Sequence, residues 1–425
     1  MPLRKAFSYL FFSSLITISL LTLSSVANLL FVKVSALYLD RSAFGTLSCL
    51  VNMLLIIMIP FGAFQSFIAQ QIAAFDAENK QHNTFCLFNI GLKMSVMVAL
   101  PLAGLLFIFD DYLTQLFHIS SDNVFMLAGV IIVFLLPFQI FLGYFQGIKS
   151  FASYCLPIFM ESCLRLTLGY SMLRTGFGIT GVLFSFVGSY TGALGLCCGL
   201  IKKKLTNPPL NSASCNFDTT VLRKNFVKIF LSFAVYGILV FSDILLVKHY
   251  FTPEQAGDYA AAANIGRFFF FIPTPLITVM YPKIVELHRT ESRREMRFVL
   301  LNIICAVALA CLAFITVCYF YAPLVIKYFL DASKYLHTVY LIRYMSVIMS
   351  FFVLINVLLY YNIARNRRAY LVLIICGTAL QILLVCRYHD YLRTVMQVLQ
   401  WTSASIFLLI AMLTIYEEKS SRVIC

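Results

Sequence analysis

Long apolar segments recur along this chain, and they limit what it can fold into. About twelve are present, most of them at least ~20 residues long, enough for a helix to cross the ~30 Å hydrocarbon core of a bilayer. A backbone in lipid must satisfy its own hydrogen bonds, so segments of this length are expected to be helices, not β-barrel strands. The expected spans are 9–38, 43–75, 85–109, 124–147, 151–173, 180–201, 226–250, 256–287, 298–321, 336–363, 369–386 and 395–416.

The composition agrees with these spans. Hydrophobic residues make up 61% of the chain and charged residues only 12%, and the mean hydropathy is +0.89. The first apolar run follows Arg4 and Lys5 and is too long for the apolar region of a typical signal peptide. The sequence therefore predicts an all-α polytopic membrane protein with an uncleaved first helix.

The basic residues predict how the chain is oriented. Of the 32 Lys and Arg residues, 20 fall in or beside the termini and the even-numbered loops, with dense clusters at Lys202–Lys204, Arg293–Arg294 and Arg367–Arg368. The loop around Asp110 and Asp111 has none. The positive-inside rule then places both termini in the cytoplasm. Because each basic run flanks a membrane helix, the net charge of +14 does not indicate a nucleic-acid partner.

An internal repeat divides the chain in half. The pattern G-x6-N occurs at Gly45–Asn52 and at Gly257–Asn264, an offset of 212 residues, and Lys33 in "NLLFVKV" matches Lys248 in "DILLVKH" at an offset of 215. Each half then holds six spans. We expect two six-helix bundles around a central cavity, residues 1–208 and 209–425, joined by a cytoplasmic linker at about 202–223. Such parallel repeats are typical of transporters, with the substrate path between the bundles.

Ionisable residues inside the spans indicate where that path could run. Each costs roughly 2.5–3.5 kcal/mol at a helix centre unless it faces water or a partner. The basic residues outnumber the acids Glu161 and Asp243, which suits an anionic substrate. The basic residues are Lys33, Lys93, Arg165, Arg267 and Arg343.

Arg267 is the strongest substrate-binding candidate. It lies about 11 residues inside its span, too deep to snorkel to the interface, and Asn264 shares its helix face. Lys33, Lys93 and Lys248 either snorkel or line the same cavity.

The two acids are candidates for ion pairing or for coupling to protons or sodium. Glu161 and Arg165 are spaced i,i+4 with the acid first, the favourable orientation on a helix. A packing role for this pair and a role in transport both remain open. Asp243 is the other candidate coupling residue.

Nothing in the sequence predicts catalysis. The thirteen cysteines are scattered without a CxxC motif, and no metal-ligand set, P-loop, GxSxG or GxGxxG pattern is present. The longest polar connection, 202–223, is too short to hold a catalytic domain. We therefore expect neither an enzyme nor a cofactor or metal.

One region resembles a known family. The stretch "DILLVKHYFTPEQAGDYAAAANIGRFFFFIPTPLITVMYPKI" is similar to the seventh and eighth helices of Wzx-type polysaccharide flippases, and "YLDRSAFGTL" resembles the corresponding part of their first half. These flippases belong to the multidrug/oligosaccharidyl-lipid/polysaccharide exporter superfamily. Arg267, followed by Pro273 and Pro282, also resembles the eighth-helix arginine of lipid II flippases, although the spacing differs slightly.

The resemblance implies a function and a location. The cargo would be an undecaprenyl-diphosphate-linked oligosaccharide of O-antigen or a related surface polysaccharide, moved from the cytoplasmic to the periplasmic leaflet of a bacterial inner membrane. Alternating access would move it without covalent chemistry. A polysaccharide polymerase and a chain-length regulator are the expected protein partners.

Three other classes remain as alternatives. A multidrug exporter of the same fold would be expected to carry more acids than bases in its cavity, the reverse of this chain. A polysaccharide polymerase or glycosyltransferase would need a large periplasmic loop or an acidic catalytic motif. A major-facilitator carrier would have a basic motif after the second span, where this chain has "DAENKQHN".

Overall fold

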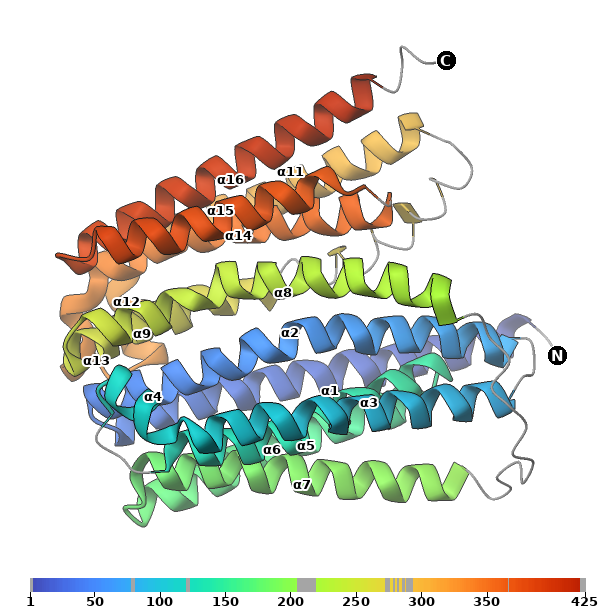
Figure 1. Ribbon diagram of the computed structural model, residues 1–425, viewed down its shortest axis with the longest axis horizontal. Coiled ribbons are helices and arrows are strands. Elements are labelled where there is room, and N and C mark those ends of the chain that lie inside the picture. Colours follow the sequence, from blue (N-terminus) through green and yellow to red (C-terminus); the bar gives the residue numbers. More distant parts are fainter. Residues whose placement is uncertain are drawn as a thin grey trace. The chain divides into compact units, whose positions relative to one another are not determined.

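The computed structural model describes residues 3–77, 81–119, 123–204, 219–271, 293–365 and 367–420, together with 276–277, 280, 283–284 and 287. Every regular element in this part of the chain is a helix (Figure 1). Pro273, Pro282 and residues 205–218 of the expected linker lie outside the described residues.

The helices agree closely with the expected spans. The first half contains α1 (Leu3–Tyr38), α2 (Arg41–Ala77), α3 (Gln81–Ile108), α4 (Asp110–Leu116), α5 (Val124–Gly147), α6 (Phe151–Arg174) and α7 (Gly178–Lys204). The second half contains α8 (Thr219–Tyr250), α9 (Pro253–Phe268), η1 (Phe269–Phe271), α11 (Arg293–Phe320), α12 (Ala322–Phe329), α13 (Ala332–Tyr335), η2 (Leu336–Thr338), α14 (Val339–Ala364), α15 (Ala369–Arg387) and α16 (Leu392–Ser420).

Ten helices within the described residues are long and apolar enough to cross a membrane. The two expected spans outside this set correspond to α6 and α9. Helix α6 has 24 residues but carries Glu161 and Arg165, and α9 has 16 residues. The all-helical, polytopic fold class expected from the sequence is confirmed.

The repeat is visible in the positions of the helix ends. Tyr38 and Tyr250, the last residues of α1 and α8, differ by 212 in residue number, as do Arg41 and Pro253, the first residues of α2 and α9. Helices α3 and α11 end, and α4 and α12 begin, at the same offset. The match between Lys33 and Lys248, at an offset of 215, is three residues out of this register.

The chain forms two compact units, each with its own core. One comprises Met1–Ala43 and Ile57–Leu231, and the other Phe44–Ile56 and Ser232–Cys425. In the first unit, the largely buried α5 packs against α3, α6 and α7, and α1 packs against α6. In the second unit, the largely buried α14 packs against α9, α11 and α16. The bundles expected at 1–208 and 209–425 stay a prediction, because compact units and transport bundles need not share boundaries.

Within the second unit, the two copies of the G-x6-N pattern pack together. A Cβ atom added to Gly45 of α2 would lie 2.8 Å from the backbone nitrogen of Gly257 of α9. One turn further, Asn264 Nδ2 donates a hydrogen bond to Ser48 Oγ over 2.9 Å. Small residues let helix backbones approach closely where neither lipid nor water separates them. This contact explains why the pattern contains glycine.

Candidate functional site: two buried arginines

The α8–α9 hairpin brings Asp243 and Arg267 together. Its turn is a capping box: Gln255 N donates to Thr252 Oγ1 over 3.4 Å, and Thr252 N donates to Gln255 Oε1 over 3.3 Å. Pro253 occupies the first turn of α9, where its missing N–H costs nothing. The local sequence thus returns α9 along α8, so residues 24 positions apart can pair.

Asp243 is almost completely buried, with 1% of its side chain exposed. Its Oδ1 accepts hydrogen bonds from Arg267 Nη2 and from the backbone nitrogen of Ile244, and its Oδ2 accepts from the Tyr259 hydroxyl over 2.8 Å. A buried carboxylate with three donors and a cationic partner is satisfied. Asp243 and Arg267 therefore form a neutral pair in the second unit.

Arg267 keeps unused hydrogen-bonding capacity. Its Nη2 also donates to the Val240 carbonyl over 3.3 Å, and its guanidinium lies 5.0 Å from the Phe241 ring centroid. Its Nε and Nη1 are buried and donate no hydrogen bond within the described residues. A guanidinium carries five N–H donors, so two nitrogens of this buried cation have no acceptor within the described residues.

The other sequence candidates near this pair differ in their surroundings. Asn264 is half-buried and bonded to Ser48, as described above. Lys248 is only 1% exposed, so it does not snorkel to the surface of the unit. Arg343 belongs to a different contact, in which its Nε donates to the Tyr319 carbonyl over 3.1 Å and its guanidinium lies 4.8 Å from the Tyr319 ring. The structure therefore brings Asp243 and Arg267 into contact, while Arg343 contacts α11.

In the first unit, Glu161 and Arg165 form the expected ion pair. Arg165 Nη1 lies 3.0 Å from Glu161 Oε1, and Arg165 Nη2 donates to Asn28 Oδ1 of α1. The guanidinium also lies 5.5 Å from the Phe31 ring and 4.8 Å from the Phe186 ring. Arg165 thus joins α1, α6 and α7.

The other two sequence candidates of this unit are lysines. Lys33 is half-buried on α1. Lys93 is exposed on α3, on the same face as Met97 and Leu100, which are 75% and 55% exposed.

The two arginine sites occupy equivalent turns of the repeat. At the offset of 212, Asn28 corresponds to Val240 and Phe31 to Asp243. The Arg165 guanidinium contacts Asn28 and Phe31, and the Arg267 guanidinium contacts Val240 and Asp243. In each half an arginine contacts the same turn of the half's first helix, α1 or α8. The arginine itself comes from α6 in the first half and from α9 in the second, so its position is not repeated.

Sequence reasoning missed three contacts of these ion pairs: Asn28 and Phe186 beside Arg165, and Tyr259 beside Asp243. Asn28 begins the quoted repeat "NLLFVKV", and Tyr259 is the aromatic residue of the flippase-like turn pattern, so both lay within recognised motifs. Phe186 had no such signal, because one phenylalanine among 41 is not distinctive. Within the described residues, no group of three or more His, Cys, Asp and Glu side chains is placed to hold a metal ion.

No protein-family model and no curated protein sequence matches this chain. Solved structures do match its fold. An inward-facing multidrug resistance MATE family transporter of the MOP superfamily aligns with a TM-score of 0.71 and 14% identity over 96% of this chain and 99% of its own. A eukaryotic MATE transporter aligns with a TM-score of 0.64 and 13% identity over 94% and 96%.

A third match concerns pocket polarity. A MOP superfamily transporter from Pyrococcus furiosus, whose reverse polarity of the binding pocket suggests a different function for that protein, aligns with a TM-score of 0.66 and 15% identity, over 96% of this chain and 95% of its own. At these identities the comparisons concern the fold alone. The chain is an all-helical membrane protein with the fold of MATE transporters of the MOP superfamily.

Proposed function

We propose that this protein is a flippase for lipid-linked anionic oligosaccharides. It moves an undecaprenyl-diphosphate-linked repeat unit of O-antigen or a related polysaccharide to the periplasmic leaflet of a bacterial inner membrane, by alternating access and without covalent chemistry. The MATE-like fold and the resemblance of the α8–α9 hairpin to Wzx-type flippases support this proposal.

The observation that carries the proposal is the buried Arg267 with two unused nitrogens. Guanidinium groups bind phosphate oxygens through paired hydrogen bonds, which a lysine ammonium cannot reproduce. Asp243 holds Nη2, so a diphosphate would accept separate hydrogen bonds from Nε and Nη1, which lie on different edges of the guanidinium. On this proposal Asp243 orients the arginine and neutralises it while no cargo is bound.

The balance of charge within the helices also supports an anionic cargo. The predicted spans contain Lys33, Lys93 and Lys248, in addition to the arginines already described, against the acids Glu161 and Asp243 in their interiors and Asp258 and Glu286 near their ends. Glu161 and Asp243 each neutralise an arginine, and basic side chains still outnumber acids in the predicted spans. A positive interior raises the local concentration of anions.

A multidrug exporter is the second candidate function. The matched inward-facing MATE structure favours it, since that protein is described as a multidrug resistance transporter. It predicts that a buried acid, Asp243 or Glu161, binds the cationic substrate. In this structure both acids are instead paired with arginine.

Deletion of the gene tests the two candidates. The flippase proposal predicts loss of surface polysaccharide and accumulation of lipid-linked repeat units on the cytoplasmic side, both restored by the wild-type gene. Unchanged polysaccharide with increased sensitivity to cationic drugs would overturn the flippase and support the exporter.

A further inference from the structure

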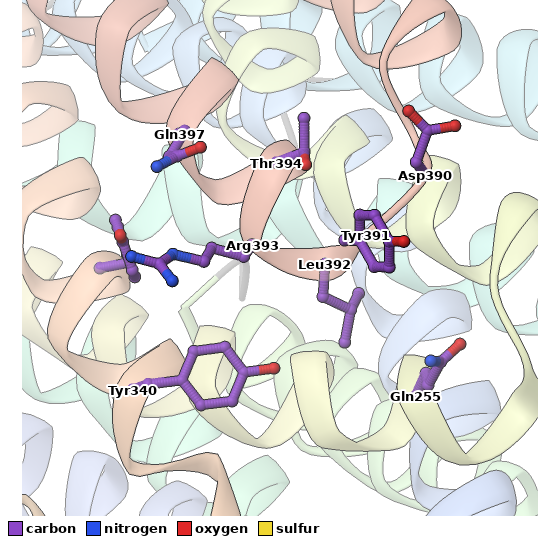
Figure 2. A pocket seen from close by; sticks show the side chains of 9 residues that line it. Gln255, Tyr340, Asp390, Tyr391, Leu392, Arg393, Thr394 and Gln397 are labelled. Atoms are coloured by element: carbon purple, nitrogen blue, oxygen red, sulfur yellow. The ribbon is translucent and has the colours of Figure 1, made fainter.

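A cavity of about 620 Å³ lies within the second unit, away from the Asp243–Arg267 pair. It is formed by the start of α9, the first turns of α14, the α15–α16 connection and the start of α16 (Figure 2). Its lining residues are Gln255, Tyr340, Tyr344, Asp390, Tyr391, Leu392, Arg393, Thr394 and Gln397. None of them was singled out from the sequence.

The lining combines aromatic rings with hydrogen-bonding groups. Three of the nine residues are tyrosines, and eight of the nine carry a hydroxyl, amide, carboxylate or guanidinium group, with Leu392 as the exception. In Figure 2, the side chains of Arg393, Leu392 and Tyr391 lie over those of Tyr340 and Gln255. Cavities of this size hold small organic ligands.

Gln255 caps α9, but the two charged groups of the cavity are not used by the fold. Asp390 and Arg393 are three residues apart, yet within the described residues they form no ion pair with each other or with another side chain. Tyr391 is 73% exposed and Tyr340 is 42% exposed. These side chains are therefore free to contact a ligand.

We infer that this cavity is a saccharide-binding subsite. A sugar ring presents hydroxyls that both donate and accept hydrogen bonds, and apolar C–H faces that pack on aromatic rings; tyrosine offers both an apolar body and a polar tip. The lining surface is mostly apolar, so a hydrophobic drug is the competing occupant. A lipid tail would leave these polar groups unsatisfied. The single guanidinium beside the single carboxylate admits neutral sugars and uronic acids.

The inference deepens the proposed flippase function and rests on it for its biological meaning. The predicted topology places Asp390 on the periplasmic side, where the sugar portion would arrive while the lipid remains in the bilayer. The cavity would then receive the saccharide at the end of translocation, and its occupancy would depend on the sugar, not on the diphosphate.

Saturation-transfer NMR on the full chain in lipid nanodiscs tests this subsite. The probes are maltotriose, chitotriose and a hyaluronan tetrasaccharide, with tetraphenylphosphonium as the hydrophobic cation. We expect at least one saccharide to bind, and Tyr391→Ala and Arg393→Ala each to weaken its binding roughly five- to tenfold through loss of ring or charged hydrogen-bond contacts. Tyr388→Ala is the matched control, because Tyr388 is an exposed tyrosine of the same connection that does not line the cavity.

The possible results separate the subsite from the flippase function. Absence of saccharide binding, or equal binding by wild type and Tyr391→Ala, would overturn the subsite. So would binding of tetraphenylphosphonium alone with the same sensitivity to Tyr391. Saccharide binding that depends on Tyr391 in a protein that moves no lipid-linked oligosaccharide would support the subsite and refute the flippase.

Discussion

Arg267 neutralises Asp243, and two of its nitrogens have no hydrogen-bond acceptor within the described residues. These two properties can be tested separately. Removing one member of a buried ion pair in soluble proteins costs about 3–5 kcal/mol, whereas removing both charges can be nearly neutral. Folding and transport should therefore respond differently to single and double substitutions.

We expect Asp243→Asn and Arg267→Gln, made singly, each to lower the amount of protein in the membrane, because each leaves a buried charge without its partner. The double variant should restore abundance toward the wild-type level but not polysaccharide export, since no guanidinium remains to bind phosphate. Quantitative immunoblotting of membranes and a surface-polysaccharide assay measure the two effects. Wild-type export by the double variant would show that Arg267 serves only to neutralise Asp243.

A milder change probes the geometry of the guanidinium. Arg267→Lys keeps the positive charge but loses the planar arrangement of donors. We expect near-normal abundance with partly impaired export, compared at equal membrane levels. Full export by Arg267→Lys would mean that charge alone is sufficient.

The Glu161–Arg165 pair leads to a different expectation. Arg165 also contacts Asn28, Phe31 and Phe186. Exchanging the two charges would therefore place a carboxylate against two aromatic faces, which favour cations. We expect the exchanged double variant to remain less stable than wild type in thermal unfolding experiments in detergent.

The control for that experiment is Arg174→Ala, which removes an exposed arginine of the same helix and should change thermal stability little. If the exchanged variant unfolded at the wild-type temperature, the contacts to α1 and α7 would contribute nothing, and a simple two-residue ion pair would explain the site.

The sequence identified both arginines and both acids, but only one of the two pairings. Glu161 and Arg165 lie on the same helix face four residues apart, so spacing predicts their contact. Asp243 and Arg267 lie on two helices, and their pairing depends on how the hairpin folds back. No periodicity within one segment contains that information.

At the scale of elements, the close approach of α2 and α9 depends on glycine. A methyl group at position 45 would come within 2.8 Å of backbone nitrogen, which cannot move aside as a flexible side chain can. Overpacking of this kind costs typically ~1–3 kcal/mol. The contact between the two G-x6-N copies can therefore be tested by substituting Gly45.

We expect Gly45→Ala to lower the thermal unfolding temperature in detergent. Gly62→Ala is the matched control on the same helix, because a Cβ atom there would meet nothing within 4 Å. Equal unfolding temperatures for the two variants would show that the α2–α9 contact relaxes without cost.

The long helices were predictable from length and hydropathy, whereas the short ones were not. Helices α4, α12 and α13 have only 7, 8 and 4 residues, and they adjoin longer apolar segments without a separate signal. One clue was present: Phe117 and Phe329, which share the offset of 212, follow α4 and end α12.

At the scale of the whole molecule, the positive-inside rule makes a prediction that the fold alone does not test. Reporter fusions after Lys204, Arg293 and Arg367 should report cytoplasm, because these positions follow or lie within basic clusters. Fusions near Asp111, Pro253 and Asp390 should report periplasm. A cytoplasmic signal at Pro253 or Asp111 would reverse the orientation and move the proposed saccharide subsite to the wrong side.

The fold of the whole chain could be predicted from the sequence because bilayer thickness dictates helix length, and because the repeat indicates that the two halves share one arrangement of helices. The cargo was harder to predict from the sequence, because a few side chains in the same fold decide whether a protein binds a phosphate, a sugar or a cationic drug. Here the features that bear on the cargo are the two Arg267 nitrogens without an acceptor in the described residues and the hydrogen-bonding groups among the tyrosines that line the cavity in the second unit.

Reconstitution tests the flippase proposal most directly. Purified protein in liposomes, supplied with undecaprenyl-diphosphate-linked oligosaccharide in one leaflet, should expose the sugar in the other leaflet, detected by a lectin excluded from the lumen. Arg267→Ala protein reconstituted at equal density should lose most of that activity. If wild-type protein left the sugar in its original leaflet while transporting a cationic dye, or if Arg267→Ala protein were as active as wild type, the proposed function of this arginine and its cargo would be contradicted.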